Sequence, residues 1–369
     1  MPVRDYPPLP VPRDSAVESD SRRRFLNAVT LLGLGVHATA SAEGAGGSSQ
    51  FPLRRHSLRV NGGRFSVLDH GNGPAVLFCH GFPDTALTWR QQMRAVAEAG
   101  YRAVALDMRG FGRSYSPSQA SLYSSRHIVA DFVGVLDALK IRSAVIVGHD
   151  WGADHAQRAA LMYPKRFRGL VSISIPYSPR GDIDAWEAIR RRGLGDRYYA
   201  LDWLKPGAEA AFKPAASSIR SILYWASASP PSGQRWDPIN PDLSILRPAP
   251  VALPTWANND YVIHTIRNFE QTGFVGGLNY YRALPISFAE LSAFKDAPIT
   301  QPSLYVWGGE DGLCRFFHPK PPELAELRRT QPNLIAQVRL DGVGHWVQHE
   351  APERLNAALL GFLKQLGSA

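Results

Sequence analysis

The chain has 369 residues, enough to bury a sizeable core in one large domain or two smaller ones. Its hydrophobic share of 44% and charged share of 20% are ordinary for a globular enzyme. The net charge of +9 comes from scattered arginines without a basic stripe interleaved with aromatic residues, so no nucleic-acid partner is expected. Two cysteines, Cys79 and Cys314, are too few for a disulfide framework and predict buried free thiols.

Residues 1–42 have the three-part plan of a secretory signal: a basic segment at Arg22–Arg24, an apolar stretch over 25–35, and small residues ending at Ala42. The stretch SRRRFL also resembles the consensus of bacterial twin-arginine signals, which direct the export of folded proteins. We therefore expect the export machinery as a partner and a periplasmic or secreted location. The apolar stretch is too short to span a bilayer comfortably, so no stable membrane anchor is expected.

After a Gly- and Ser-rich linker expected over 43–50, short apolar runs alternate with longer amphipathic ones. A hairpin is predicted around Asn61-Gly62-Gly63. Buried strands are predicted over 75–81, 101–110, 143–149 and 168–176, separated by helices over 88–100, 127–140 and 153–164. This alternation predicts a mostly parallel sheet covered by helices on both faces, with residues 51–176 as the first part of the core.

The alternation stops between residues 177 and 285, where the chain is rich in Trp, Tyr and Pro and shows helical stretches without a buried strand. It resumes over 286–369, with strands expected at 302–311 and 336–345 and a last helix at 351–366. The simplest interpretation is an α/β core interrupted by a helical cap over 177–285.

Four motifs follow predicted strands, where the ligands of such sheets collect. They are HGFPD (80–84), DMRGFGRS (107–114), GHDWGA (148–153) and the pair Asp311 and His345. The third is a Gly-x-Ser-x-Gly turn in which Asp150 replaces the serine. The chain order of nucleophile, acid and histidine is that of the α/β hydrolases.

From about residue 51 onward the sequence resembles the α/β-hydrolase-fold epoxide hydrolases, with haloalkane dehalogenases as their nearest relatives. The resemblance rests on these motifs and on GGLNYYRA (276–283), GGED (308–311) and GVGHW (342–346). It implies an α/β-hydrolase fold with an eight-stranded, mostly parallel sheet flanked by helices and an inserted cap. It implies no metal and no organic cofactor.

The resemblance assigns the nucleophile to Asp150, the base to His345 and the orienting acid to Asp311, with Glu310 next to it as a competitor. A carboxylate is ionised at neutral pH and can displace a leaving group from a saturated carbon, forming an alkyl ester. His345 would then activate water to hydrolyse this ester. The backbone N–H groups of Phe82 and Trp151 would stabilise the oxyanion.

Two cap tyrosines are implied as proton donors to the opening epoxide oxygen, because a phenol is a suitable weak acid. The stretch LNYYRA maps one donor to Tyr281, and YYALDWLKPGAE maps its partner to Tyr199. Neighbouring helix positions point about 100° apart, so only one of Tyr280 and Tyr281 can face the site. The same choice exists between Tyr198 and Tyr199.

The expected substrate is a mostly apolar epoxide and the product a vicinal diol. One alternative is a haloalkane dehalogenase with the same triad, in which Trp151 and one indole of the cap would bind the halide; the candidate indoles are Trp203, Trp225 and Trp256. Another is a catalytically silent protein that binds an apolar ligand. The sequence leaves the particular epoxide, the stereochemistry and the oligomeric state open.

Overall fold

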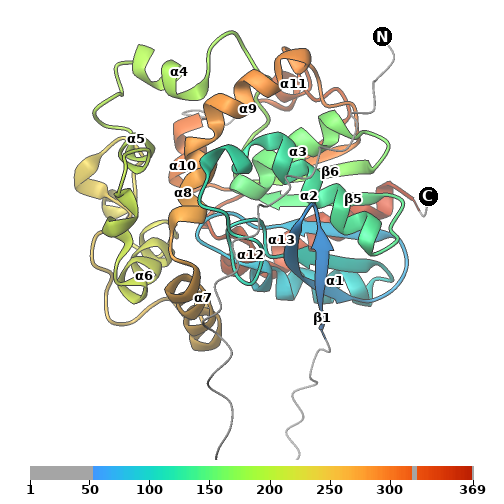
Figure 1. Ribbon diagram of the computed structural model, residues 1–369, viewed down its shortest axis with the longest axis horizontal. Helices are drawn as coiled ribbons and strands as arrows, with labels where there is room; N and C mark the ends of the chain where they lie inside the picture. The colour runs from blue at the N-terminus through green and yellow to red at the C-terminus, as the bar shows by residue number, and fades with distance from the viewer. Residues whose placement is uncertain (1–52, 318–321, 368–369) are drawn as a thin grey trace, which may run out of the picture.

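The computed structural model describes residues 53–317 and 322–367 (Figure 1). The expected export signal at 1–42 and the linker at 43–50 lie outside these residues. Within the described ranges, no helix has both the length and the apolar character needed to cross a membrane.

A single eight-stranded sheet forms the centre of the described structure, in the order β1-β2-β4-β3-β5-β6-β7-β8. β1 pairs antiparallel with β2, which forms the expected hairpin, and β2 pairs antiparallel with β4, whereas all further neighbours are parallel. This sheet confirms the predicted α/β fold. The strands are β1 (Arg54–Val60), β2 (Gly63–His70), β3 (Ala75–Cys79), β4 (Arg102–Leu106), β5 (Ala144–His149), β6 (Phe167–Ile173), β7 (Ser303–Gly308) and β8 (Leu334–Leu340).

Helices cover both faces of the sheet because successive strand residues point to opposite sides. In β3, Val76 and Phe78 belong to one apolar cluster, and Leu77 and Cys79 to the other. The first cluster is covered by α1 (Arg90–Glu98) and α13 (Pro352–Gln365), and the second by α2 (Ser125–Ala138) and α3 (Trp151–Met162). The continuous apolar runs of the parallel strands are thus buried on both sides.

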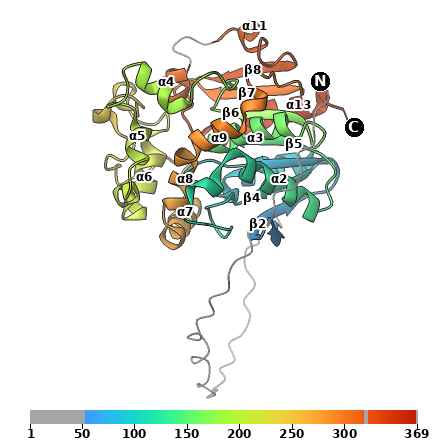
Figure 2. The same cartoon turned by 45° about the horizontal axis from the view of Figure 1, so that its top comes forward.

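The chain between β6 and β7 is mainly helical and lies to one side of the sheet (Figures 1 and 2). Its side chains join the same apolar cluster as α2 and α3, so the cap and the core share one continuous interior. The helix α9 crosses residue 285, and the domain boundaries remain a prediction. The α-helices of this segment are α4 (Ala185–Arg191), α5 (Tyr199–Trp203), α6 (Ala215–Trp225), α7 (Asn259–Thr272), α8 (Val275–Arg282) and α9 (Leu284–Glu290).

Beyond the cap, the chain completes the sheet and its cover with α10 (Gly312–Phe317), α11 (Leu324–Leu327) and α12 (Val347–Glu350). Asp150 directly follows β5, Asp311 lies in the turn after β7, and His345 lies in the loop after β8. The carboxyl ends of parallel strands meet at one edge of a sheet, so this topology delivers the three side chains to the same place.

Candidate active site

Asp150 occupies a sharp turn between β5 and α3. Its φ is 54° and its ψ is −123°, a conformation that residues other than glycine rarely adopt. A Cβ atom on Gly148 would lie 2.2 Å from the carbonyl oxygen of Gly152 within the turn, and one on Gly152 would lie 2.1 Å from that of Cys79 at the end of β3. These close approaches explain why the turn needs glycine two residues before and two residues after Asp150.

The two carboxylate oxygens of Asp150 have different surroundings. Oδ1 accepts a hydrogen bond from the backbone N–H of Phe82 at 2.9 Å, whereas Oδ2 lies 3.9 Å from Nε2 of His345. Burial raises the pKa of Asp150, and the charge of His345 together with the N–H groups of Phe82 and Trp151 opposes this rise. One oxygen is therefore fixed, and the other faces the histidine with no direct hydrogen bond.

His345 is held on its other side by Asp311. Nδ1 of His345 lies 3.0 Å from Oδ2 of Asp311, and both side chains are buried. Glu310, the competing acid, instead pairs with Arg235. The structure thus brings Asp311 to the histidine and directs Glu310 away from it.

Asp311 and His345 each favour the charged form of the other. Burial lowers the pKa of His345, but the carboxylates of Asp311 and Asp150 outweigh it and raise the pKa above 6.5. Burial raises the pKa of Asp311, but the charge of His345 and hydrogen bonds from His345, Ser174 and Leu313 lower it to about 2. At neutral pH Asp311 is therefore ionised, and it can stabilise a proton on His345.

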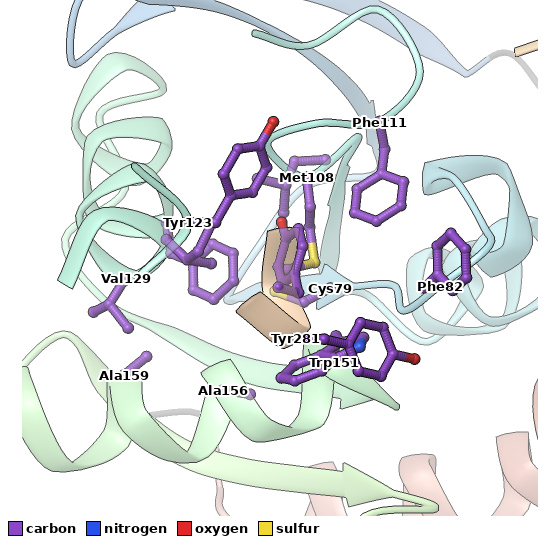
Figure 3. Close-up of a cluster of buried hydrophobic side chains, with 14 of the residues drawn as sticks. Cys79, Phe82, Met108, Phe111, Tyr123, Val129, Trp151, Ala156, Ala159 and Tyr281 are labelled. Carbon is purple, nitrogen blue, oxygen red and sulfur yellow. The ribbon is translucent and has the colours of Figure 1, made fainter. Parts of the chain in front are cut away.

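Of the tyrosines on α8, Tyr281 faces Asp150. It lines a cavity shared with Asp150, and its ring lies 4.7 Å from that of Trp151 (Figure 3). The hydroxyl of Tyr280 donates instead to the backbone carbonyl of Arg109 at 2.8 Å. Because neighbouring helix positions point about 100° apart, only one of the two tyrosines points toward Asp150, and that one is Tyr281.

Both tyrosines at the start of α5 line the same cavity, but only Tyr199 also borders the space next to His345. The ring centroids of Tyr199 and Tyr281 are 6.4 Å apart. Burial raises the pKa of both phenols well above 10, and the negative charge of Asp150 raises it further. Both hydroxyls are protonated at neutral pH and are able to donate.

The large cavity, which Asp150 lines together with Tyr198, Tyr199 and Tyr281, has a volume of about 530 Å³. The smaller space that borders His345 has a volume of about 20 Å³, which is room for about one water molecule. Within the described part of the chain, no three His, Cys, Asp or Glu side chains are grouped to hold a metal ion. Apolar side chains dominate the lining of the large cavity, among them Ile175, Ile183, Trp186, Ile189, Leu284 and Phe288.

The indoles considered as halide donors are placed unequally. Trp151 lines the large cavity and Trp203 the small one, whereas Trp225 and Trp256 line neither. Nε1 of Trp225 donates to the backbone carbonyl of Arg247, and Trp256 stacks on His349. Two of the three cap indoles are therefore unsuited to bind a halide in these cavities, and a nearer indole, Trp236, was overlooked in the sequence.

A family model for the alpha/beta hydrolase fold matches residues 74–352. The chain belongs to the α/β-hydrolase family. A Caballeronia sordidicola protein named epoxide hydrolase is 49% identical over 312 residues, which cover 85% of this α/β hydrolase and 94% of that protein. Epoxide hydrolase A of Mycobacterium tuberculosis is 36% identical over 83% of this chain and 96% of its own length.

Solved structures of epoxide hydrolases are similar to this chain in fold and sequence. An epoxide hydrolase from an endophytic Streptomyces superposes with a TM-score of 0.79 at 33% identity, covering 85% of this α/β hydrolase and 96% of that chain. Epoxide hydrolase A of Mycobacterium thermoresistibile gives a TM-score of 0.77 at 34% identity over 85% and 98% of the two chains.

Two polar side chains of this α/β hydrolase adjoin the triad and were missed in the sequence. Ser174 follows β6 and contacts Asp311, and its place at the carboxyl end of a parallel strand was the only available signal. The half-buried carboxylate of Glu350 accepts hydrogen bonds from the backbone N–H groups of Gly344, Trp346 and Ala228. Glu350 thereby ties the loop that carries His345 to the end of α6, and no sequence pattern indicated it.

Proposed function

We propose that this α/β hydrolase converts an apolar epoxide into a vicinal diol through a covalent ester on Asp150. The observation that carries the proposal is that a buried carboxylate and two protonated phenols, Tyr199 and Tyr281, line one largely apolar cavity. The names of the relatives support the same reaction class.

In the first step, Oδ2 of Asp150 attacks a ring carbon of the epoxide, and the bond between that carbon and the ring oxygen breaks. Oδ1 stays on the N–H of Phe82, which leaves Oδ2 as the attacking atom. The released alkoxide takes a proton from Tyr281 or Tyr199. The products of this step are an alkyl ester on Asp150 and one phenolate.

In the second step, His345 removes a proton from a water molecule in the small cavity, and the water attacks Cγ of Asp150. The N–H groups of Phe82 and Trp151 stabilise the oxyanion on Oδ1, and Asp311 stabilises the protonated histidine. The bond between Cγ of Asp150 and the ester oxygen attached to the substrate then breaks. Protonated His345 gives its proton to that leaving oxygen, and the diol departs. The carboxylic acid left on Asp150 loses its proton, which restores the phenol.

Incubation with styrene oxide and, separately, with 1-bromobutane tests this function. We expect styrene oxide to give the diol and 1-bromobutane to release no bromide. We also expect Asp150→Asn to abolish diol formation. Bromide without diol would favour a haloalkane dehalogenase instead. Binding of styrene oxide without either product, unaffected by Asp150→Asn, would identify a silent binding protein.

We also propose that the protein is exported through its N-terminal arginine pair, on the support of the stretch SRRRFL alone. Fractionation of bacteria that express the full chain tests the proposal. The chain should reach the periplasm or the medium, and Arg22→Lys with Arg23→Lys should keep it in the cytoplasm. Equal export of both forms would contradict a twin-arginine route.

A further inference from the structure

Ser174 has a backbone conformation that suits glycine rather than serine. It directly follows β6, its φ is 71°, and its side chain is fully buried. Side chains disfavour this left-handed region, and such outliers gather at functional sites. Glycine would fit the position without strain, so the presence of a hydroxyl group there requires an explanation.

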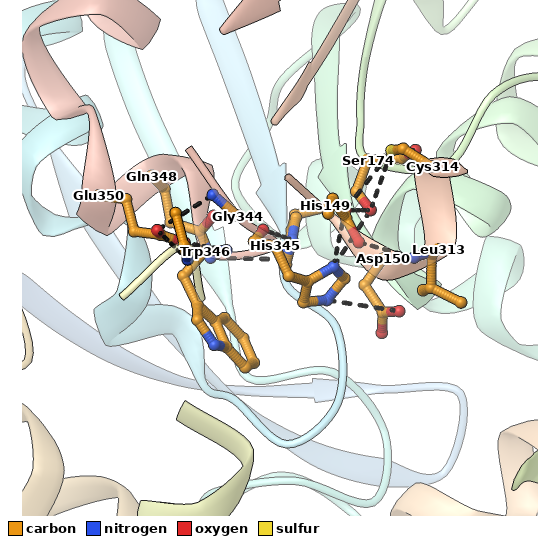
Figure 4. A network of polar contacts seen from close by, with 12 residues as sticks. His149, Asp150, Ser174, Leu313, Cys314, Gly344, His345, Trp346, Gln348 and Glu350 are labelled. Carbon is orange, nitrogen blue, oxygen red and sulfur yellow. Dashed lines mark hydrogen bonds and ion pairs between the residues drawn. The ribbon is translucent and has the colours of Figure 1, made fainter. Parts of the chain in front are cut away.

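The hydroxyl of Ser174 reaches the acid of the triad. Oγ donates to Oδ2 of Asp311 at 2.6 Å, the same oxygen that lies 3.0 Å from Nδ1 of His345. Oγ of Ser174 itself lies 3.2 Å from Nδ1 of His345 (Figure 4). The backbone N–H of Leu313 holds the other oxygen of Asp311 at 2.9 Å. The carboxylate is thereby fixed at both oxygens.

The backbone of Ser174 is anchored independently of this hydroxyl. Its N–H donates to the carbonyl of Val306 at 2.9 Å, which ties it to β7. Its carbonyl accepts from the hydroxyl of Tyr305 at 3.1 Å and lies 2.9 Å from Sγ of Cys314. These contacts fix the main chain whatever side chain it carries, so the role of the hydroxyl can be tested separately.

We propose that Ser174 is a positioning residue for the hydrolysis step, in which its hydroxyl holds Oδ2 of Asp311 against Nδ1 of His345. This inference rests on the proposed two-step reaction. In the first step Asp150 and the phenols act without the histidine pair, whereas the second step needs His345 as a base. Loss of the hydroxyl should therefore slow ester hydrolysis and leave ester formation intact.

The hydroxyl also affects the pH at which His345 works. A donor on Oδ2 shares the negative charge of Asp311, which would otherwise act on His345 alone. Without that donor, the carboxylate raises the pKa of His345 further. Because only neutral His345 can take a proton from water, the acidic limb of the hydrolysis rate should move to higher pH.

Two variants separate the hydroxyl from the backbone. Ser174→Ala removes the hydroxyl and keeps a side chain at positive φ, and Ser174→Gly removes the hydroxyl and relieves the strain. The control is Ser303→Ala at the start of β7, since its hydroxyl is equally buried and has no hydrogen-bond partner among the residues that the structure describes. Rapid-quench mixing with styrene oxide, read by mass spectrometry, gives the rates of ester formation and ester hydrolysis.

Both Ser174 variants should hydrolyse the ester roughly 10- to 100-fold more slowly, the usual effect of losing a hydrogen bond to a charged group. Their ester formation should match the wild type, their acidic limb should lie at higher pH, and Ser303→Ala should behave as wild type. Wild-type hydrolysis and an unshifted pH profile in Ser174→Gly would overturn the inference, as would equal slowing of both steps. If the wild-type chain formed no ester on Asp150, the proposed function would fail and this inference with it.

Discussion

Replacing His345 by glutamine should stop the reaction half-way. Glutamine can still donate a hydrogen bond toward Asp311 but cannot accept a proton from water. Ester formation should continue, because in the proposed reaction Asp150 itself attacks the epoxide, and its Oδ1 keeps the hydrogen bond from the N–H of Phe82 at 2.9 Å. Ester hydrolysis should stop, because the proposed base of that step is His345, which borders the space for one water molecule beside Asp150.

A positioned general base contributes roughly 10²- to 10⁴-fold to a rate, or about 3 to 5 kcal/mol in the barrier. The 3.9 Å between Nε2 of His345 and Oδ2 of Asp150, together with the anchor on Asp311, favours the upper part of this range. The alkyl ester should then accumulate to nearly one equivalent per chain.

Intact-mass measurement after mixing with styrene oxide should show the protein heavier by one substrate, and peptide mapping should place the addition on the peptide with Asp150. His264→Gln on α7 is the control, since this histidine lines neither cavity, and it should turn over as wild type. An addition on another peptide, or undiminished diol formation by His345→Gln, would refute the assignment of base and nucleophile.

Further measurements address the phenols and the charge pair. Tyr281→Phe and Tyr199→Phe should each slow ester formation from styrene oxide roughly 10- to 100-fold, since each removes a charge-assisted donor; an unimpaired double variant in rapid-quench assays would exclude them as donors. Asp311→Asn should destabilise the fold by about 2 kcal/mol at pH 7, the equivalent of a pKa lowered from 3.8 to about 2. This stabilisation is present above pH 3.8 and lost as the pH falls toward 2, so urea titrations should show the difference shrinking over that window, and a constant difference would contradict the linkage. Because the pKa of His345 is raised, the acidic limb of diol release should lie above pH 6.5, and a limb well below that value in a pH–rate profile would count against His345 as the base.

The fold was predictable because its signals are local. The glycine spacing around Asp150 marks the sharp turn within a few residues of sequence, and the apolar runs mark strands without reference to the rest of the chain. Helix geometry limits Tyr280 and Tyr281 to one member at the site, and the packed cap shows which: Tyr280 bonds to a backbone carbonyl, while Tyr281 faces Asp150. The same argument fails for the other pair, because Tyr198 precedes α5 with an extended backbone and both Tyr198 and Tyr199 line the large cavity.

The surroundings of the triad were not predictable, because they join residues far apart in the chain. Ser174 and Asp311 are 137 positions apart, and Glu350 and Ala228 are 122 apart. Neither contact has a sequence spacing that chemistry prescribes, since both depend on how the strand ends and the cap meet. The acid itself was ambiguous in sequence between Glu310 and Asp311, and only the direction of each side chain separates them.

A single turnover in heavy-oxygen water, with enzyme in excess over styrene oxide, probes the covalent route most directly. If an ester on Asp150 is the intermediate, the solvent oxygen enters the carboxyl group of residue 150, and the first diol carries only light oxygen. If the first diol already contains the heavy isotope while the carboxyl group of residue 150 does not, water opens the ring directly and Asp150 is not the nucleophile.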